Sequence, residues 1–192
     1  MATTLTEAQI LELLRRYGAV QEGHFLLSSG MHSRQYIQCA LLLQYPEVAA
    51  QMCAALAERF RAEQVHTVLG PALGAVVLAY ETARQLGARA LWAERSGGRM
   101  ALRRGFNLTS GERVLVVEDV VTTGGAAKEV AHLAERAGAV VVGVAAIVDR
   151  SGGGHRLRWH FEPLARLDVQ AYLPASCPLC REGVPLLKPG SR

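Results

Sequence analysis

The sequence predicts an α/β fold organised around a mostly parallel sheet. Apolar runs alternate along the chain with segments whose apolar residues recur every three or four positions, which is the pattern of strands followed by helices. The clearest run, Val114–Val117, has four consecutive aliphatic residues, as expected of a strand buried on both faces. A helix-forming segment follows at 126–136. With 192 residues, half of them hydrophobic, the chain can bury the core of a single domain.

The composition favours a cytoplasmic protein that acts on a small anion. No apolar run approaches the roughly 18 residues of a membrane span, and residues 1–4 show no signal-peptide pattern. We therefore expect no membrane partner. The formal net charge of +4 suits an anionic substrate at least as well as a nucleic acid. Only Lys128 and Lys188 among the 21 lysines and arginines are lysines. The four cysteines do not make a disulfide framework.

The first part of the chain predicts two helices and a hairpin. Residues Thr6–Gln9 form a capping-box pattern at the start of a first helix, which ends at Gly18. Residues 24–38 have the pattern of two short strands around a polar turn at 28–33. Pro46 suits the first position of a second helix. The inner face of that helix carries Val48, Met52, Leu56 and Phe60.

Two further units place loops at strand ends. A strand at 65–69 leads through a turn at 70–75 into a helix, and the apolar strand 139–148 ends in the polar residues 149–154. Ligands gather at the carboxyl ends of the strands in open α/β sheets. Residues 149–154 are therefore a candidate ligand-binding segment.

The clearest ligand-binding pattern lies at Glu118–Ala126. Glu118 and Asp119 stand where the strand should stop, and Thr122–Gly125 form a small hydroxylated turn before the next helix. Glycine N–H groups, threonine hydroxyls and the positive end of the helix dipole suit a phosphate. The carboxylates suit a sugar diol or a hydrated Mg²⁺. Because side chains alternate along a strand, we expect the strand to end between the two acids. The pattern predicts phosphate beside ribose; the alternative is a buried strand ending in a turn without a ligand.

Residues 114–126 resemble the phosphoribosyl-pyrophosphate (PRPP) motif of type I phosphoribosyltransferases: hydrophobic residues, an acidic pair, two variable residues and a Thr/Gly-rich loop. The resemblance implies an α/β type I phosphoribosyltransferase fold, with a central sheet flanked by helices. The single domain 1–192 would have a PRPP-binding core at about 46–154 and a small hood from about 1–45 and 155–192. Mg²⁺ is the implied cofactor, held mainly through PRPP, with the acidic pair as candidate ligands. The residues implied to bind PRPP are Glu118, Asp119, Val120, Val121, Thr122, Thr123, Gly124, Gly125 and Ala126.

The segment 24–38 resembles the orotate-binding segment of orotate phosphoribosyltransferases, through the pattern Phe-x-Leu-x-Ser-Gly and a following strand with Tyr-Ile. An exposed hairpin without a ligand is the alternative. An arginine at position 150 would pair bidentately with the orotate carboxylate. Many family members place a lysine where this chain has Ser28, so that contact must come from elsewhere or be absent. The residues implied to bind orotate are Ser28, Tyr36, Ile37, Thr122 and Arg150.

Two other segments complete the implied site. At Ala72, Leu73 and Gly74 the resemblance implies a loop whose N–H groups hold pyrophosphate, whereas the alternative is a simple Gly-Pro turn. The basic segment 95–109 follows a strand at 88–94 and is long for a loop, as lids are.

This basic segment suits the neutralisation of charge on departing pyrophosphate, with Arg95, Arg99 and Arg103 as the catalytic candidates. Arginine stays protonated, so we expect electrostatic stabilisation rather than general acid catalysis. A solvated basic hairpin is the alternative. The resemblance also implies a homodimer in which the 95–109 loop acts across the interface.

The C-terminal region contains a lone Cys-x-x-Cys at Cys177 and Cys180. Zinc would need two more ligands, and Cys39, Cys53 and the histidines show no matching spacing. We therefore expect reduced structural thiols. This ending resembles the C-terminus of one bacterial subgroup of orotate phosphoribosyltransferases.

The resemblance implies transfer of the 5-phosphoribosyl group from PRPP to orotate, giving orotidine 5′-monophosphate and pyrophosphate in the de novo synthesis of UMP. Two alternatives stay open: a purine phosphoribosyltransferase, and a PRPP-binding regulator that acts on nucleic acid. No nucleic-acid-binding module is visible in the sequence, so we expect no such partner.

Overall fold

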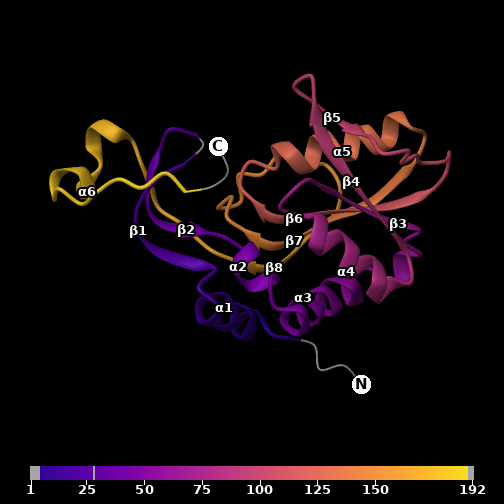
Figure 1. Ribbon diagram of the computed structural model, residues 1–192, viewed down its shortest axis with the longest axis horizontal. Helices are drawn as coiled ribbons and strands as arrows, with labels where there is room; N and C mark the ends of the chain where they lie inside the picture. The colour runs from indigo at the N-terminus through magenta and orange to yellow at the C-terminus, as the bar shows by residue number, and fades with distance from the viewer. Residues whose placement is uncertain (1–4, 28, 190–192) are drawn as a thin grey trace.

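The computed structural model describes residues 5–27 and 29–189 and contains a main sheet and a smaller, separate one (Figure 1). The main sheet has six strands in the order β5-β4-β3-β6-β7-β8, and all neighbours are parallel except β4 and β5. This arrangement confirms the predicted mostly parallel α/β sheet. Its strands are β3 (Thr67–Pro71), β4 (Arg89–Ser96), β5 (Arg99–Leu102), β6 (Arg113–Val121), β7 (Val140–Asp149) and β8 (Phe161–Arg166).

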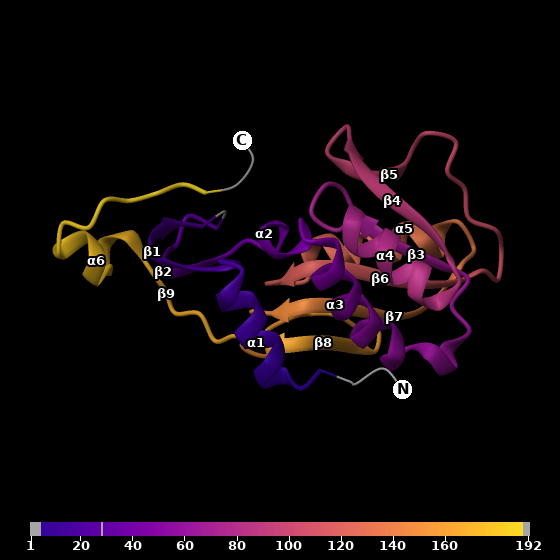
Figure 2. The same cartoon turned by 60° about the horizontal axis from the view of Figure 1, so that its bottom comes forward.

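Helices cover both faces of the main sheet (Figure 2). On β6, Leu115 and Val117 pack with α1, α3 and α4, whereas Val114 and Val116 pack with α5 on the other face. All four side chains are fully buried, which confirms the strand predicted from this apolar run. The helices are α1 (Glu7–Arg16), α2 (Ala40–Leu43), α3 (Pro46–Arg59), α4 (Val76–Leu86), α5 (Gly125–Arg136) and α6 (Pro178–Arg181), with 3₁₀ turns η1 (Arg61–Glu63) and η2 (Pro174–Ser176).

The predicted helix boundaries are confirmed at α1 and α3. At α1, the Thr6 hydroxyl accepts the Gln9 N–H at 3.3 Å, and the Gln9 side chain accepts the Thr6 N–H at 2.8 Å. Pro46 is the first residue of α3. The apolar residues predicted for its inner face are all buried, namely Val48, Met52, Leu56 and Phe60. No helix in the described ranges is long and apolar enough to cross a bilayer.

The smaller sheet and the C-terminal segment form the hood, which we define as β1 (Val20–Leu26), β2 (His32–Ile37), β9 (Ala171–Tyr172) and residues 174–189. Its strands are antiparallel in the order β1-β2-β9. The predicted hairpin is present, but β1 begins earlier than expected and the turn ends before His32. In Figure 1 the hood lies beside the main sheet.

The core extends into ranges that the sequence assigned to the hood. Strand β8 lies within 155–192 but pairs with β7 in the main sheet, and α1 packs against β8. We therefore propose a hood narrower than the ranges 1–45 and 155–192. This strand was not predicted because the β8 segment, Phe161–Arg166, contains a proline and two charged residues, which are uncommon within strands.

The basic segment 95–109 is not a loop throughout. Strand β5 pairs with β4, and Gly97 and Gly98 form the turn with φ of 56° and 78°. Met100 of β5 is buried on the α5 side of the core, so apolar packing adds to the strand pairing in holding β5. The prediction of a structureless segment is therefore wrong for its first half, and the hairpin alternative describes that half better.

Candidate active site

The two acids at the end of β6 face different ways. The strand continues to Val121, so the prediction that it ends between Glu118 and Asp119 is wrong. Glu118 Oε2 accepts the N–H of Ala127 on α5 at 3.1 Å. Asp119 lies on the opposite face, where both carboxylate oxygens would be 3.2 Å from a Cβ atom at Gly74. Glycine at position 74 therefore leaves the space beside the Asp119 carboxylate open.

Both acids hold protons more tightly than ordinary carboxyl groups. Burial, together with the charge of Asp119, raises the pKa of Glu118 to about 7, although the Ala127 N–H opposes this shift. Burial also raises the pKa of Asp119, against the hydrogen bond from the Val120 N–H. Carboxylates with such pKa values gain from a cation or from hydroxyl donors. Their oxygens are the hard donors that Mg²⁺ prefers, so the acidic pair fits the implied cofactor.

A loop suited to an anion follows β6. Helix α5 begins at Gly125, and Gly124 before it has φ of 76°. A Cβ atom at Gly124 would lie 3.0 Å from the Leu157 side chain, so a side chain here would meet both strain and crowding. Thr122 and Thr123 are exposed beside the start of the helix. Hydroxyls and free N–H groups at the positive end of a helix suit a phosphate.

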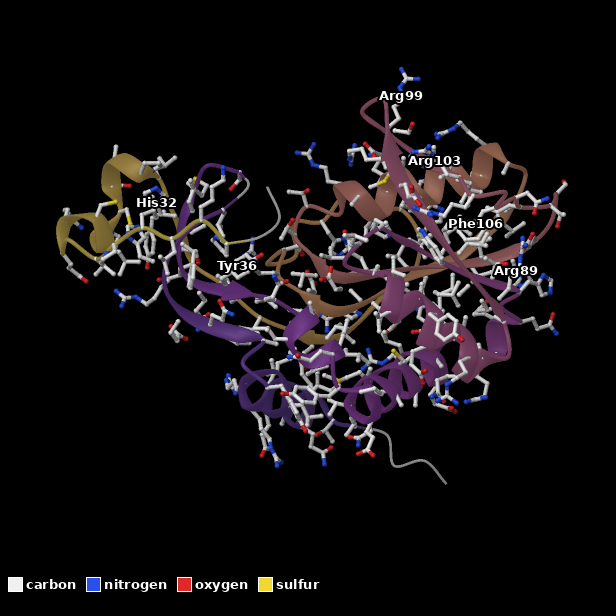
Figure 3. All side chains as sticks on the ribbon, in the orientation of Figure 1. His32, Tyr36, Arg89, Arg99, Arg103 and Phe106 are labelled. Carbon is white, nitrogen blue, oxygen red and sulfur yellow. The ribbon has the colours of Figure 1, made fainter. Side chains whose placement is uncertain are left out.

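A cavity of about 310 Å³ lies between the end of β6 and the hood. The predicted residues that line it are Tyr36, Ile37, Asp119, Val120, Thr122 and Arg150. Figure 3 places Tyr36 on the side of the hood that faces the main sheet. The structure thus brings the predicted orotate and PRPP residues to one cavity. Ser28 lies outside the described residues.

The same cavity has four walls that were not among the predicted site residues, namely Leu26, Leu27, Gln38 and Pro189, although Leu27 belongs to the Phe-x-Leu-x-Ser-Gly pattern. The two leucines precede the hairpin turn, and the position of this turn was the available signal for them. Pro189 comes from the far end of the chain. Its approach depends on the C-terminal segment pairing with β1, where the Leu26 N–H donates to the Leu187 carbonyl at 2.8 Å. Local sequence patterns do not reveal such a contact.

Arg150 supplies a cation to this cavity. Its N–H donates to the Val121 carbonyl at 2.8 Å, which fixes the backbone beside β6. Burial lowers the pKa of Arg150, although nearby Tyr36 opposes the shift. Within the described residues, its guanidinium forms no ion pair with a protein carboxylate. A half-buried guanidinium in this state favours an anionic ligand such as a carboxylate.

A second cavity, of about 360 Å³, lies between the turn after β3 and the basic hairpin. Ala72 and Leu73 line it from the turn, and Arg95 and Arg104 line it from the hairpin side. Leu73 is 86% exposed, whereas the Ala72 N–H already donates to the Ala93 carbonyl at 2.8 Å. The predicted pyrophosphate loop therefore faces cationic side chains.

The three predicted catalytic arginines are not brought together. Arg95 lines the second cavity and lies 3.2 Å from Glu129, and Arg103 lies 4.0 Å from Glu94. Arg99 stands at the tip of the β4–β5 hairpin and points away from the body of the protein (Figure 3). Arg99 and Arg103 line neither cavity.

The sequence missed one cluster altogether. His24 and His32 lie beside Cys177 and Cys180, with one ligand atom of each within 4.8 Å of all the others. The histidines show no matching spacing along the chain, yet the fold places two of them beside these cysteines. Spacing along the chain did not reveal the cluster because strand pairing brings the histidines together across the hairpin. Their positions on either side of its turn were the available signal.

A family model described as phosphoribosyl transferase domain matches residues 41–161. The matched range contains β3 to β7, the acidic pair and the anion-binding loop. The chain therefore belongs to the phosphoribosyltransferase family.

Sequence relatives and solved structures show which members of the family this chain is similar to. An orotate phosphoribosyltransferase of Caldicellulosiruptor bescii is 52% identical over 182 residues, which cover 95% of this chain and 96% of the relative. That of Caldanaerobacter subterraneus subsp. tengcongensis is 50% identical over 188 residues, covering 98% and 99%. The solved orotate phosphoribosyltransferase of Aeropyrum pernix superposes with a TM-score of 0.71 at 26% identity, covering 82% and 93%. Within the family, this chain groups with the orotate phosphoribosyltransferases.

Proposed function

We propose that this chain transfers the 5-phosphoribosyl group from PRPP to orotate, releasing orotidine 5′-monophosphate and pyrophosphate in the de novo synthesis of UMP. The observation that carries the proposal is the cavity of about 310 Å³, where Asp119 and Thr122 at the end of β6 meet Tyr36 and Arg150. It offers a ribose-binding acid and a carboxylate-binding cation in one space.

The donor would lie along the carboxyl edge of the main sheet. Residues Thr122–Ala126 would hold the 5′-phosphate at the start of α5, and Ala72–Gly74 would hold pyrophosphate. Asp119 faces the cavity and would bind the ribose hydroxyls directly. Glu118 faces α5, where its Oε2 accepts the Ala127 N–H, so any contact it makes with the donor would come from that side. The two acids therefore have different roles in this proposal, with Glu118 also supporting the phosphate loop.

The acceptor would occupy the hood side of the cavity. Arg150 would pair with the orotate carboxylate, while Tyr36, Ile37 and Thr122 position the ring. Orotate is already an anion, so it can attack C1 of the ribose as this carbon gains oxocarbenium character. No nucleophilic side chain is needed.

Charge on the departing pyrophosphate must be balanced. Mg²⁺, held mainly by PRPP and contacted by Asp119, would supply Lewis-acid stabilisation when bound. The hairpin arginines would add permanent positive charge without donating a proton. Arg95 and Arg104 line the second cavity together with Ala72 and Leu73.

We also propose a homodimer in which the tip of the β4–β5 hairpin acts in the neighbouring subunit. Arg99 at this tip lines neither cavity of its own chain. Leu73 before α4, and Val77 and Tyr80 on α4, are exposed apolar side chains, at 86%, 48% and 66%. Covering such side chains stabilises association. The cytoplasmic location stays a prediction from the sequence.

Orotate consumption, followed by its ultraviolet absorbance with and without PRPP, tests the proposed reaction. We expect loss of orotate that requires both PRPP and Mg²⁺ and produces stoichiometric pyrophosphate. Turnover of adenine or hypoxanthine but not orotate would favour a purine enzyme. PRPP binding without turnover of any base would favour a regulator.

A further inference from the structure

The histidine–cysteine cluster lies in the hood, outside the proposed active site. His24 comes from β1 and His32 from β2, whereas Cys177 directly precedes α6 and Cys180 lies within it. Figure 3 labels His32 in the hood. None of the four lines either cavity beside the main sheet. His24 and Cys177 are each 1% exposed and His32 is 5% exposed. Four polar side chains from three segments therefore converge on one largely buried point.

The atoms that converge have the separations of a tetrahedral metal site. His24 Nε2 lies 3.0 Å from His32 Nδ1, and the two sulfur atoms, Cys177 Sγ and Cys180 Sγ, lie 3.5 and 3.7 Å from His24 Nε2. Cys180 Sγ is 3.3 Å from His32 Nδ1. Zn–N bonds of about 2.0–2.1 Å and Zn–S bonds of about 2.3 Å give tetrahedral edges of about 3.3–3.8 Å. A small contraction or expansion of the cluster would accommodate the ion.

The ring of His24 is held in the orientation that a ligand needs. Its Nδ1 lies 2.8 Å from the Val184 carbonyl oxygen, which can only accept, so Nδ1 carries the proton. The unprotonated Nε2 then faces His32 and the two thiols. A metal-binding histidine commonly donates its other N–H to a carbonyl in this way, because that bond fixes both tautomer and orientation.

We propose that His24, His32, Cys177 and Cys180 bind a structural Zn²⁺ that fastens the C-terminal segment to the β1–β2 hairpin. Two thiolates and two neutral imidazoles form a closed ligand set typical of structural zinc. The thiols would release their protons on binding, and the two resulting negative charges would neutralise the ion in its buried position. The site does not depend on the proposed reaction.

The ion would act where the C-terminal segment meets β1. Beyond the cysteines, Leu187 donates its N–H to the His24 carbonyl and accepts the Leu26 N–H, both at 2.8 Å. Two residues later, Pro189 reaches the cavity beside the main sheet. A metal that fixes the C-terminal segment against β1 would therefore also fix one wall of that cavity.

Metal analysis of the full chain tests the proposal directly. The protein should be produced without a histidine tag, kept reduced, and examined by mass spectrometry for zinc and competing transition metals. We expect one zinc ion per chain. Substoichiometric zinc that does not rise when zinc is added to the reduced protein would overturn the proposal. A Cys177–Cys180 disulfide, found after rapid alkylation of thiols during cell lysis, would also overturn it because both ligands would be consumed.

Variants identify the ligands. Cys180→Ser should disturb the fold least of the ligand variants, since Cys180 is exposed. Both Cys180→Ser and His32→Gln should lose the zinc. Cys53→Ala and His160→Gln are matched controls away from the cluster, and both should keep it. Zinc retained at full stoichiometry in Cys180→Ser and His32→Gln, or lost equally in the controls, would refute the assignment.

Two measurements on the unaltered chain test the proposal even if a variant fails to fold. Replacement of zinc by Co²⁺ should give the strong visible bands of a tetrahedral site and the near-ultraviolet band of thiolate ligation, whereas octahedral spectra would contradict the ligand set. Free zinc at a hundred times its dissociation constant should raise the folding equilibrium constant of the zinc-binding unit about a hundredfold over the metal-free form. Unchanged stability on adding or removing zinc would rule out the structural role.

Discussion

The main sheet and the hood are held together by different kinds of contact. Val114–Val117 of β6 are fully buried and pack alternately into two apolar layers. In the hood, β9 has two residues, and His24, His32 and Ser33 are among the buried side chains. The Ser33 hydroxyl oxygen lies 3.0 Å from the Gln170 carbonyl. Apolar packing tolerates many sequences, whereas the hood depends on a few directional contacts between segments far apart in the chain.

This difference in packing suggests that the main sheet and the hood contribute differently to stability and to ligand binding. The main sheet carries the acidic pair and the phosphate loop at the carboxyl end of β6, between two buried apolar layers. The hood supplies Tyr36 and the C-terminal wall of the cavity from a less deeply packed unit. We therefore expect changes at the edge of the main sheet to weaken donor binding, and changes on the hood side to act mainly on the acceptor.

The largest effect should come from removing both acids at the end of β6. Glu118→Gln with Asp119→Asn should lower kcat/KM for PRPP by roughly 100-fold or more, because each lost charged hydrogen bond costs about 1.5–3 kcal/mol. The fold should persist, since burial already disfavours both charges. Steady-state kinetics with PRPP varied, and calorimetric PRPP binding, measure the effect.

The matched control for this pair is Glu162→Gln on β8, which lines neither of the two cavities beside the main sheet. It should leave the kinetics unchanged. Unchanged turnover in the double variant would remove the proposed ribose contact, and equal losses in the control would point to a general effect of charge.

A different acid tests the stability of the main sheet without touching the site. Glu112 lies at the opposite end of β6, where it contacts Thr67, Thr109 and Arg89. Burial alone would raise its pKa, but hydrogen bonds from the Thr67 hydroxyl, the Thr109 N–H and hydroxyl, and the Arg89 guanidinium outweigh this and lower the pKa to about 2. Glu112→Gln should lower the free energy of unfolding at pH 7 by about 3 kcal/mol, at 1.36 kcal/mol per pKa unit.

The sign of the pH dependence follows from that shift. The pKa of Glu112 is depressed in the folded state from 4.5 to about 2, so its stabilisation is present above pH 4.5 and is lost as the pH falls towards 2. Denaturant unfolding from pH 7 to pH 2 should show this decline, and Glu112→Gln should reduce it. Parallel pH curves for the two proteins would contradict the assignment of this network.

The next effect concerns the acceptor. Arg150→Ala should raise KM for orotate by roughly tenfold to 100-fold, because a hydrogen-bonded charge pair contributes about 1.5–3 kcal/mol. KM for PRPP should change less. Arg166→Ala, which removes an exposed cation on β8 outside the cavity, is the control and should alter neither constant. If PRPP and orotate were affected equally, Arg150 would not be specific to the acceptor.

The sequence predicted the parts of this fold that follow from local chemistry. The apolar run of β6, the capping box at Thr6 and Pro46 at the start of α3 each determine their element from neighbouring residues, and the structure confirms them. The acidic pair and the Thr/Gly loop were visible for the same reason. The relative orientation of the two acids was not predicted. Strand β6 continues past both of them to Val121, so Glu118 and Asp119 lie on opposite faces, and no local pattern sets where the strand ends.

What the sequence could not predict depends on long-range packing. Strand β8 pairs with the edge of β7 although it contains Pro163 and two charged residues. The basic hairpin places Met100 in the apolar layer beside α5. The histidine–cysteine cluster requires the hairpin register and the path of the C-terminal segment together. Each case joins residues that are distant in sequence, where periodicity carries no information.

The smallest effect, and the one that most sharpens the comparison, concerns the hairpin arginines. Arg99→Ala and Arg103→Ala should each lower kcat by roughly threefold to tenfold with little change in KM for orotate, since a solvent-exposed cation stabilises departing pyrophosphate less than a buried one. Arg61→Ala on η1, far from both cavities, controls for net charge. Mixing inactive Glu118→Gln/Asp119→Asn subunits with Arg99→Ala subunits should restore part of the activity if the hairpin acts across a dimer. Full activity of both single variants would exclude a role for the hairpin tip, and unrestored activity in the mixture would confine its action to its own subunit.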